Sequence, residues 1–234
     1  MDDRKISICI PTFERDEMLL DSFRSVHDDE RVSEVVIVDD CSRIEQFNRV
    51  AGLLAPFKKV RLFRNAVNKD CYANKMESLF RATNDFCILL DSDNIIDIEY
   101  LDKIYEFPEW DAKIAYMPSF ARPLFSYVAY EGVTFDKSNI AEYIDKPMVS
   151  TCLNCMNYFV NRHEYARVWQ DNIVPHTADS ILQNYNWLNA GNGIHVVPGL
   201  SYYHRVHDGS HYKQNVHKTG RLYAEIEQKI KILK

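Results

Sequence analysis

Two aspartates at the end of an apolar run are the residues of this sequence best suited to hold a metal ion. Residues 86–90 are five consecutive apolar side chains, and Asp91, Ser92, Asp93 and Asn94 follow directly. A run of this kind is typical of a strand buried on both faces, and here it ends in two carboxylates. Each carboxylate raises the cost of ionising the other unless a cation offsets their charge. Mg²⁺ or Mn²⁺ with a phosphate group would suit these oxygens, and a solvated turn is the alternative.

The first hundred residues alternate between strand and helix patterns. The spacing of apolar residues predicts strands at 6–10, 35–38, 60–63 and 86–90, and helices at 17–27, 44–54 and 72–82. Ser42 would be the N-cap of the second of these helices. This order implies an α/β fold with a mostly parallel, Rossmann-like central sheet and helices on both faces.

Polar residues stand at the carboxyl ends of three of these strands. They are Pro11-Thr12, Asp39-Asp40 and Asp91-Ser92-Asp93. Ligands of open parallel sheets bind at the carboxyl ends of the strands. We therefore expect these three clusters to meet at one edge of the sheet, which the solvated-turn alternative does not predict.

The second half of the chain has a less regular pattern, which favours a mixed sheet. We expect helices at 97–107, 162–170 and 179–189, and strands at 113–117, 127–135, 152–160, 194–197 and 200–203. Residues 222–233 have helical spacing with charges between the apolar positions. We expect one domain over residues 1–234, with a nucleotide-binding half at about 1–95, an acceptor half at about 96–220 and a C-terminal helix at 221–234.

Composition narrows the class of protein. The chain has 234 residues, of which 46% are apolar, and its net charge of −6 argues against coating a nucleic acid. The charged N-terminus does not resemble a signal peptide, and no apolar stretch reaches the roughly 18 residues of a membrane helix. We expect a cytoplasmic protein, with a peripheral position at a membrane as the alternative. The oligomeric state is open.

Three motifs together resemble family 2 glycosyltransferases with the GT-A fold. They are ICIPTFER at residues 8–15, VIVDDCS at 36–42 and LLDSDN at 89–94, while the glycine-rich nucleotide loops of other folds are absent. The resemblance implies an enzyme that moves a sugar from a nucleotide diphosphate, usually UDP, to an acceptor hydroxyl with inversion at the anomeric carbon. The sequence departs from the family at Cys41, where glycine is usual, and at Glu14, where asparagine is usual.

The resemblance also implies roles for individual residues. Asp91 and Asp93 would form the Asp-x-Asp motif, in which Asp93 binds Mn²⁺ or Mg²⁺ and Asp91 binds the ribose or a metal-bound water. Asp40, or its neighbour Asp39, would accept a hydrogen bond from the imide N–H of uracil, because a carboxylate only accepts. Lys75 would contact a phosphate, with a surface lysine as the alternative. The remaining residues expected at the nucleotide sugar are Pro11, Thr12, Glu14, Asn68 and Ser92.

Two downstream segments extend the resemblance. In the family a Glu-Asp pair opens a helix and its aspartate is the catalytic base; here Asp179 is kept and Ala178 replaces the glutamate. The alternative is a purely structural role, in which Asp179 caps the N-terminus of the helix. The segment from His204 to Ser210 looks like the R-x-H-x-x-S loop that folds over the diphosphate. In it, His207, ranked above His204, would add a nitrogen ligand to the metal, and Arg205 and Ser210 would contact the donor.

These features together predict a metal-dependent inverting glycosyltransferase of glycan or polysaccharide synthesis. The donor would be a UDP-sugar, and the acceptor a hydroxyl-bearing glycan, a lipid-linked molecule or a small molecule. Two alternatives stay open: a sugar nucleotidyltransferase, and a non-catalytic module that binds nucleotide sugars, which the loss of the glutamate before Asp179 keeps in view.

Overall fold

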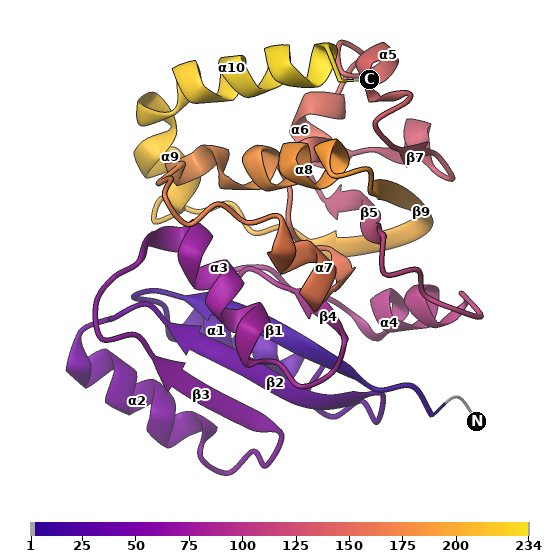
Figure 1. Ribbon diagram of the computed structural model, residues 1–234. Coiled ribbons are helices and arrows are strands. Elements are labelled where there is room, and N and C mark those ends of the chain that lie inside the picture. Colours follow the sequence, from indigo (N-terminus) through magenta and orange to yellow (C-terminus); the bar gives the residue numbers. More distant parts are fainter. Residues whose placement is uncertain (1–2, 234) are drawn as a thin grey trace.

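A nine-stranded sheet runs through residues 3–233, the part of the chain that the computed structural model describes (Figure 1). The strands are β1 (Ile6–Thr12), β2 (Val32–Asp39), β3 (Val60–Arg64), β4 (Phe86–Leu89), β5 (Ile114–Arg122), β6 (Phe125–Ser126), β7 (Thr134–Phe135), β8 (Phe159–Asn161) and β9 (Gly193–Tyr203). Their order across the sheet is β3-β2-β1-β4-β8-β5-β9-β7, with β6 paired to β5. Both predicted halves of the chain therefore contribute to one sheet.

The longer helices alternate with the strands of the first half, whereas in the second half the last helix packs mainly on other helices. They are α1 (Glu17–Arg24), α2 (Ile44–Leu54), α3 (Asp70–Arg81), α4 (Ile98–Tyr105), α8 (Asp179–Asn189) and α10 (Gly220–Lys231). Shorter turns of helix are α5 (Ile140–Tyr143), α6 (Val149–Leu153), α7 (Arg162–Arg167) and α9 (His211–Asn215), with 3₁₀ turns η1 (Val128–Tyr130), η2 (His176–Ala178) and η3 (Val216–Lys218). No helix in residues 3–233 has both the length and the apolar character needed to cross a membrane.

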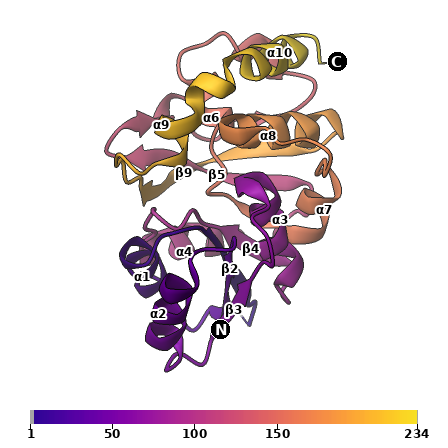
Figure 2. The same ribbon diagram turned by 90° about the vertical axis from the view of Figure 1, so that its left-hand side faces the viewer.

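The order in which the parallel strands are added to the sheet reverses at β1. The chain builds β1, β2 and β3 outward in one direction and then returns through α3 to place β4 on the other side of β1. Because crossovers are right-handed, α1 and α2 lie on one face and α3 on the other, as Figure 2 shows. Such a reversal opens a crevice at the carboxyl ends of the two strands, which is where α/β sheets bind ligands.

The strands of the first half are apolar because both of their faces are covered. Ile8, Ile10 and Ile88 have no exposed surface, and every residue of β1 is buried. The predicted parallel sheet is thus confirmed for β1 to β4. In the second half β5 pairs with β9 in parallel, whereas β6, β7 and β8 pair in the antiparallel sense, so the sheet is mixed there, as predicted.

A strand of only three residues, β8, joins the two halves of the sheet. It is antiparallel to β4 and also to β5, where Phe159 is paired with Tyr116. The ring of Phe159 stacks on Phe86 with a centroid distance of 5.5 Å and meets Trp110 edge-on at 4.7 Å. Aromatic packing therefore accompanies a short stretch of backbone pairing at this seam.

Several predictions for the second half were wrong in detail. The expected strand at 127–135 is the 3₁₀ turn η1 followed by the two-residue strand β7, because Gly132 turns the chain with a φ of 79°. The expected strand at 152–160 is helix α6, a loop and the short β8. The two strands expected at 194–203 are one strand, β9, whose pairing with β5 shifts register near Pro118.

Candidate active site

The carboxyl ends of β1, β2 and β4 meet at one edge, as predicted. Thr12 is the register partner of Asp39, and the backbone N–H of Asp40 donates to the carbonyl of Thr12 over 2.8 Å. The loop after β1 then contacts both neighbours: the N–H of Glu14 donates to the Ser42 hydroxyl, and Arg15 pairs with Asp93. Pro11 lies in β1 and is buried. Three segments far apart in sequence therefore meet at this edge of the sheet.

Asp40 is a buried carboxylate held by neutral donors. Its Oδ1 accepts hydrogen bonds from the Asn65 amide over 2.8 Å and from the backbone N–H of Lys69 over 2.9 Å. Burial raises the pKa of the Asp40 carboxyl above its ordinary value, although these bonds oppose the shift. Within residues 3–233, none of the hydrogen bonds formed by Asp40 uses Oδ2. That oxygen can accept from a ligand.

Asp39 and Thr12 are two further polar residues at the ends of β2 and β1. The Asp39 carboxylate accepts a hydrogen bond from the backbone N–H of Ser42 over 2.9 Å. The N-cap of α2 is Arg43, so the prediction that Ser42 caps this helix was wrong. The hydroxyl of Thr12 is buried and has no hydrogen-bond partner among the described residues. A buried hydroxyl without a partner is costly, which favours a ligand atom beside Thr12.

The two departures from the family motif occupy left-handed backbone. Glu14 has a φ of 49° and Cys41 a φ of 66°. Asparagine and glycine adopt this conformation at little cost, whereas glutamate and cysteine do so rarely. The Glu14 carboxylate accepts from Nε of Arg43 over 3.1 Å, which links the first loop to the start of α2. Both loops therefore hold a non-glycine residue in a conformation that such residues seldom adopt.

Asn157, a residue that the sequence analysis did not identify, holds the Asp-x-Asp loop. Its side-chain oxygen accepts from the backbone N–H of Asp91 over 2.9 Å and from the Asn94 amide over 3.2 Å. Its amide nitrogen donates to Oδ2 of Asp91 over 3.1 Å. Asn157 lies just before β8 and has 2% of its surface exposed, so one buried side chain fixes the backbone and the carboxylate of Asp91 together.

Asp93 is bracketed by two basic side chains. Nη1 of Arg15 lies 2.9 Å from Oδ2 of Asp93, and Nε2 of His207 lies 3.1 Å from the same oxygen. Arg15 also donates to the hydroxyl of Ser92 over 3.4 Å, and Ser92 is itself buried. Arg15 was not singled out from the sequence, although it ends the first motif at residues 8–15.

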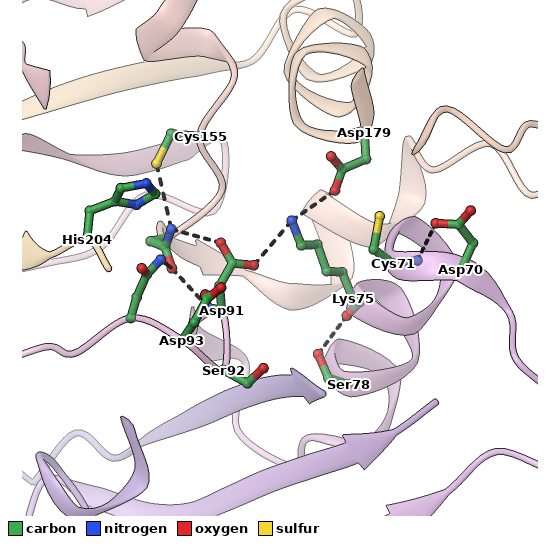
Figure 3. A network of polar contacts seen from close by, with 12 residues as sticks. Asp70, Cys71, Lys75, Ser78, Asp91, Ser92, Asp93, Cys155, Asp179 and His204 are labelled. Atoms are coloured by element: carbon green, nitrogen blue, oxygen red, sulfur yellow. Dashed lines mark hydrogen bonds and ion pairs between the residues drawn. The ribbon is translucent and has the colours of Figure 1, made fainter. Parts of the chain in front are cut away.

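Lys75 lies between the Asp-x-Asp loop and the predicted catalytic base (Figure 3). Its Nζ is 3.3 Å from Oδ1 of Asp91 and 2.8 Å from Oδ2 of Asp179. Burial alone would lower the pKa of Lys75, but the two carboxylates outweigh it and raise that pKa well above its ordinary value. Burial likewise opposes ionisation of Asp91, yet Lys75 keeps the pKa of that carboxyl below its usual range. Lys75 is 8% exposed, which excludes the surface-lysine alternative.

Asp179 is the first residue of α8 and does not cap it. The N-cap is Ala178, no side-chain cap bond is formed, and the carboxylate of Asp179 turns to Lys75 instead. The capping alternative is therefore wrong. The turn η2 before Asp179 is held by a hydrogen bond of 2.6 Å between the hydroxyls of Thr177 and Thr219. Ala178 is fully buried where the family has glutamate.

The other predicted site residues lie at different distances from these acids. The Asn68 amide donates to the carbonyl of Asp40 over 3.1 Å. His204 packs edge-on against Phe125, and burial lowers the pKa of its imidazole. The Arg205 guanidinium pairs with Asp21 on α1, 3.0 Å away, and not with Asp91 or Asp93. Ser210 precedes α9 as its N-cap residue.

The donor set at Asp93 fits a divalent cation that arrives with a diphosphate. The Asp93 carboxylate and the His207 imidazole offer one oxygen and one nitrogen at the same point, and these suit Mn²⁺ or Mg²⁺. Asp91 keeps a contact with Lys75 on one carboxylate oxygen and with Asn157 on the other. No group of three or more acidic, histidine or cysteine side chains within residues 3–233 forms a metal cage. Phosphate oxygens and water would have to supply the remaining ligands.

A family model described as glycosyl transferase family 2 matches residues 7–132, more than half of the chain. A comparison with curated protein sequences finds no match. Among solved structures, TarS of S. aureus crystallised as residues 1–349 with UDP-GlcNAc matches with a TM-score of 0.69 and 16% identity, over 97% of this chain and 70% of that one.

Two other solved structures share the fold. The mannosyltransferase PcManGT of Pyrobaculum calidifontis, in complex with GDP-Man and Mn²⁺, matches with a TM-score of 0.63 and 12% identity, over 98% of this chain and 69% of that one. The full TarS chain matches with a TM-score of 0.67 and 16% identity over 94% of this chain, which spans 39% of its length. The sheet and its flanking helices have the GT-A architecture, and the protein belongs to glycosyl transferase family 2.

Proposed function

We propose that the protein is a metal-dependent, inverting glycosyltransferase that transfers a sugar from a UDP-sugar to an acceptor hydroxyl. The acceptor would be a glycan, a lipid-linked molecule or a small molecule, and the product a glycan or polysaccharide. The observation that carries the proposal is the facing arrangement of the Asp-x-Asp loop and Asp179 across Lys75, at the point where the strand order reverses.

The nucleoside would lie over the ends of β1 and β2. Oδ2 of Asp40 would accept the imide N–H of uracil, and the unpaired hydroxyl of Thr12 would bond the ligand. Pro11, Glu14 and Asn68 would line this part of the crevice. A uracil imide donates at N3, whereas cytosine has no proton there, so a carboxylate at this place favours UDP over CDP.

The diphosphate would lie at the end of β4, beside Asp93 and His207. A divalent cation held there would neutralise the negative charge that develops on the leaving diphosphate. Arg15 is placed to move from Asp93 to a phosphate oxygen when the cation takes its place. Ser92 and Ser210 would contact the donor in the same region, and Arg205 would do so only after leaving Asp21.

Asp179 would act as the general base. Its carboxylate accepts the proton of the acceptor hydroxyl while the hydroxyl oxygen attacks the anomeric carbon from the face opposite the diphosphate. The C1–oxygen bond to the diphosphate breaks as the new glycosidic bond forms, so a single displacement inverts the anomeric configuration. The position of Asp179 at the start of α8 keeps it on a rigid element.

Release of UDP from UDP-sugars tests the proposal. With Mn²⁺ present, the wild-type protein should bind UDP in calorimetry and release it from one of UDP-glucose, UDP-galactose or UDP-GlcNAc. Asp179→Asn should retain UDP binding and lose about 10²–10⁴-fold in kcat, the range of general-base catalysis. Asp85→Asn is the matched control, because Asp85 is an exposed aspartate whose side chain pairs with His163 and touches no residue of the site.

The same experiment separates the alternatives. A non-catalytic module would bind UDP-sugars without releasing UDP, and a sugar nucleotidyltransferase would form pyrophosphate from a nucleoside triphosphate and a sugar phosphate. Unchanged turnover in Asp179→Asn would remove the base from the mechanism. Failure to bind any nucleotide, with or without Mn²⁺, would overturn the proposal as a whole.

A further inference from the structure

The ammonium group of Lys75 joins two carboxylates that come from different parts of the site. Asp91 belongs to the loop after β4, on the donor side, and Asp179 opens α8, on the acceptor side. Lys75 itself projects from α3, which packs against β1 and β2 (Figure 3). Lys75 and Asp179 are 104 residues apart in the sequence. They meet because α3 lies between the sheet and α8.

Lys75 provides the positive charge in the immediate surroundings of Asp179. The titratable side chains of Cys71 and Tyr72 on α3, and of Tyr165 on α7, also interact electrostatically with that carboxylate. Burial raises the pKa of all three groups, so each of them is neutral at physiological pH. Asp91 lies on the far side of Lys75 and is an anion.

The helix that carries Lys75 is fixed against the base. The hydroxyl of Tyr72 donates to Oε1 of Gln183 on α8 over 2.8 Å, and the Cys71 thiol contacts the carbonyl of His176 in η2 over 3.4 Å. Tyr72 and Gln183 are almost completely buried. These contacts hold α3 at a fixed distance from Asp179, so the backbone that carries Lys75 does not have to be ordered when the ion pair forms.

We propose that Lys75 is a positioning residue for the reaction, which holds the Asp179 carboxylate in place relative to the donor loop. The inference rests on the proposed function and goes beyond it, because it assigns Lys75 to the base and not to a phosphate. Two of the three N–H donors of the ammonium group face carboxylates within 3.3 Å, so two anions already offset its charge. A shift of the base by about 1 Å can cost 10²-fold in rate.

Three variants test the assignment. Lys75→Met removes the charge and keeps the length of the side chain, Lys75→Arg keeps a cation, and Lys103→Met is a control at an α4 lysine that pairs with Glu106. UDP affinity is measured by calorimetry with Mn²⁺, and kcat by UDP release from the active UDP-sugar. We expect Lys75→Met to lose about 10²-fold in kcat, the cost of a displaced base, with the Kd for UDP changed less than threefold.

The arginine variant should regain at least a tenth of the wild-type kcat, and Lys103→Met should keep all of it. A loss of UDP affinity as large as the loss of kcat would instead identify Lys75 as a phosphate ligand and overturn the inference. So would an unchanged kcat in Lys75→Met. The thermal unfolding midpoint of each variant, and its binding of UDP, show whether the protein is folded.

A double-mutant cycle shows whether Lys75 acts through Asp179. If it does, adding Lys75→Met to Asp179→Asn lowers kcat by less than threefold further, because the base is already absent. A full additional 10²-fold loss would mean that Lys75 acts independently of the base, contrary to the inference. A wild-type protein that neither binds UDP nor releases it would refute the proposed function itself. A wild-type enzyme that is active and whose kcat is unchanged by Lys75→Met would refute the inference on Lys75 alone.

Discussion

Two pairs of aspartates stand at the ends of β2 and β4, the strands on either side of β1, and their charges are balanced in different ways. Asp39 and Asp40 accept hydrogen bonds from backbone N–H groups and from an asparagine amide, and the nearest cation to Asp39, Arg64, is 3.7 Å away. Asp91 and Asp93 instead contact basic side chains. Those side chains are Lys75, Arg15 and His207.

The surroundings of each pair determine which ligand it suits. Neutral donors leave the first pair as a hydrogen-bond acceptor for a neutral group, such as a nucleobase. The second pair is surrounded by basic side chains. A metal cation could replace one of these side chains at a carboxylate, and a phosphate could then pair with the basic side chain, since electrostatic contacts in a partly buried site are strong. Acids of the same type, one strand apart, can therefore serve the two ends of one donor molecule.

The largest expected effect is at the cation-balanced pair. Asp93→Asn should lower kcat/KM by about 10³-fold, because it removes the carboxylate expected to hold the cation against the diphosphate. In a thermal-shift assay the stabilisation by UDP that depends on Mn²⁺ should disappear. Asp39→Asn is the comparison variant in the other pair, and an equal loss of Mn²⁺-dependent stabilisation there would contradict the division of roles.

At the neutral-donor pair we expect a change of nucleotide preference. Asp40→Asn should weaken UDP binding by about 10–100-fold, the value of a hydrogen bond to a charged group, and should reduce the preference for UDP over CDP. Calorimetry with UDP, CDP and GDP measures both quantities. If UDP binding falls while the ratio of UDP to CDP affinity is unchanged, Asp40 does not contact the base.

A smaller effect is expected at Asn157, which holds Asp91 from the second half of the chain. Asn157→Ala removes three hydrogen bonds to the loop and should reduce kcat/KM for the UDP-sugar by about tenfold, through looser placement of Asp91. Asn189→Ala, at an exposed asparagine on α8, is the matched control. Equal kinetics for the two variants would show that the loop is held without Asn157.

The smallest effect concerns stability alone, at an acid away from the site. Glu34 is buried in β2, and although burial opposes its ionisation, bonds from Ser7, Thr83 and Arg61 lower its pKa below the ordinary value. Glu34→Gln should lower the free energy of unfolding at pH 7 by about 1–3 kcal/mol and leave kcat unchanged.

The pH dependence of this effect follows from the direction of the pKa shift. The bonded form of Glu34 is the carboxylate, so its contribution is present above the unfolded-state pKa of about 4.3 and is lost as the pH falls through the lower folded-state pKa. Urea titrations of wild type and Glu34→Gln between pH 7 and pH 3 should converge at the acid end. A gap in stability that stays constant over this range would exclude the linkage.

Much of the donor side could be predicted because its signals are local. Strands buried on both faces leave uninterrupted apolar runs, and the acids follow those runs directly, so residues 6–12, 32–39 and 86–89 were placed within a few positions. The edge at which they meet follows from the parallel direction of the strands, which the alternation of strands and helices already implies.

The missed parts depend on contacts between distant residues. Asn157 lies in a stretch expected to be a strand, because the apolar side chains of 152–160 fit a short helix and a short strand equally well. Nothing near Lys75 in the sequence indicates that Asp179 is its partner. Arg15 could have been noticed from its place in the first motif, but its contact with Asp93 depends on how the loop after β1 folds back.

The seam formed by β8 has a consequence for how such enzymes diversify. Three residues of backbone pairing are a weak constraint on the angle between the donor-side and acceptor-side parts of the sheet, and the rings of Phe86, Trp110 and Phe159 pack at this seam. Exchanging one ring for a smaller or larger side chain would tilt one part against the other. The spacing between leaving group and nucleophile could thus be retuned for acceptors of different size while every reacting residue stays the same.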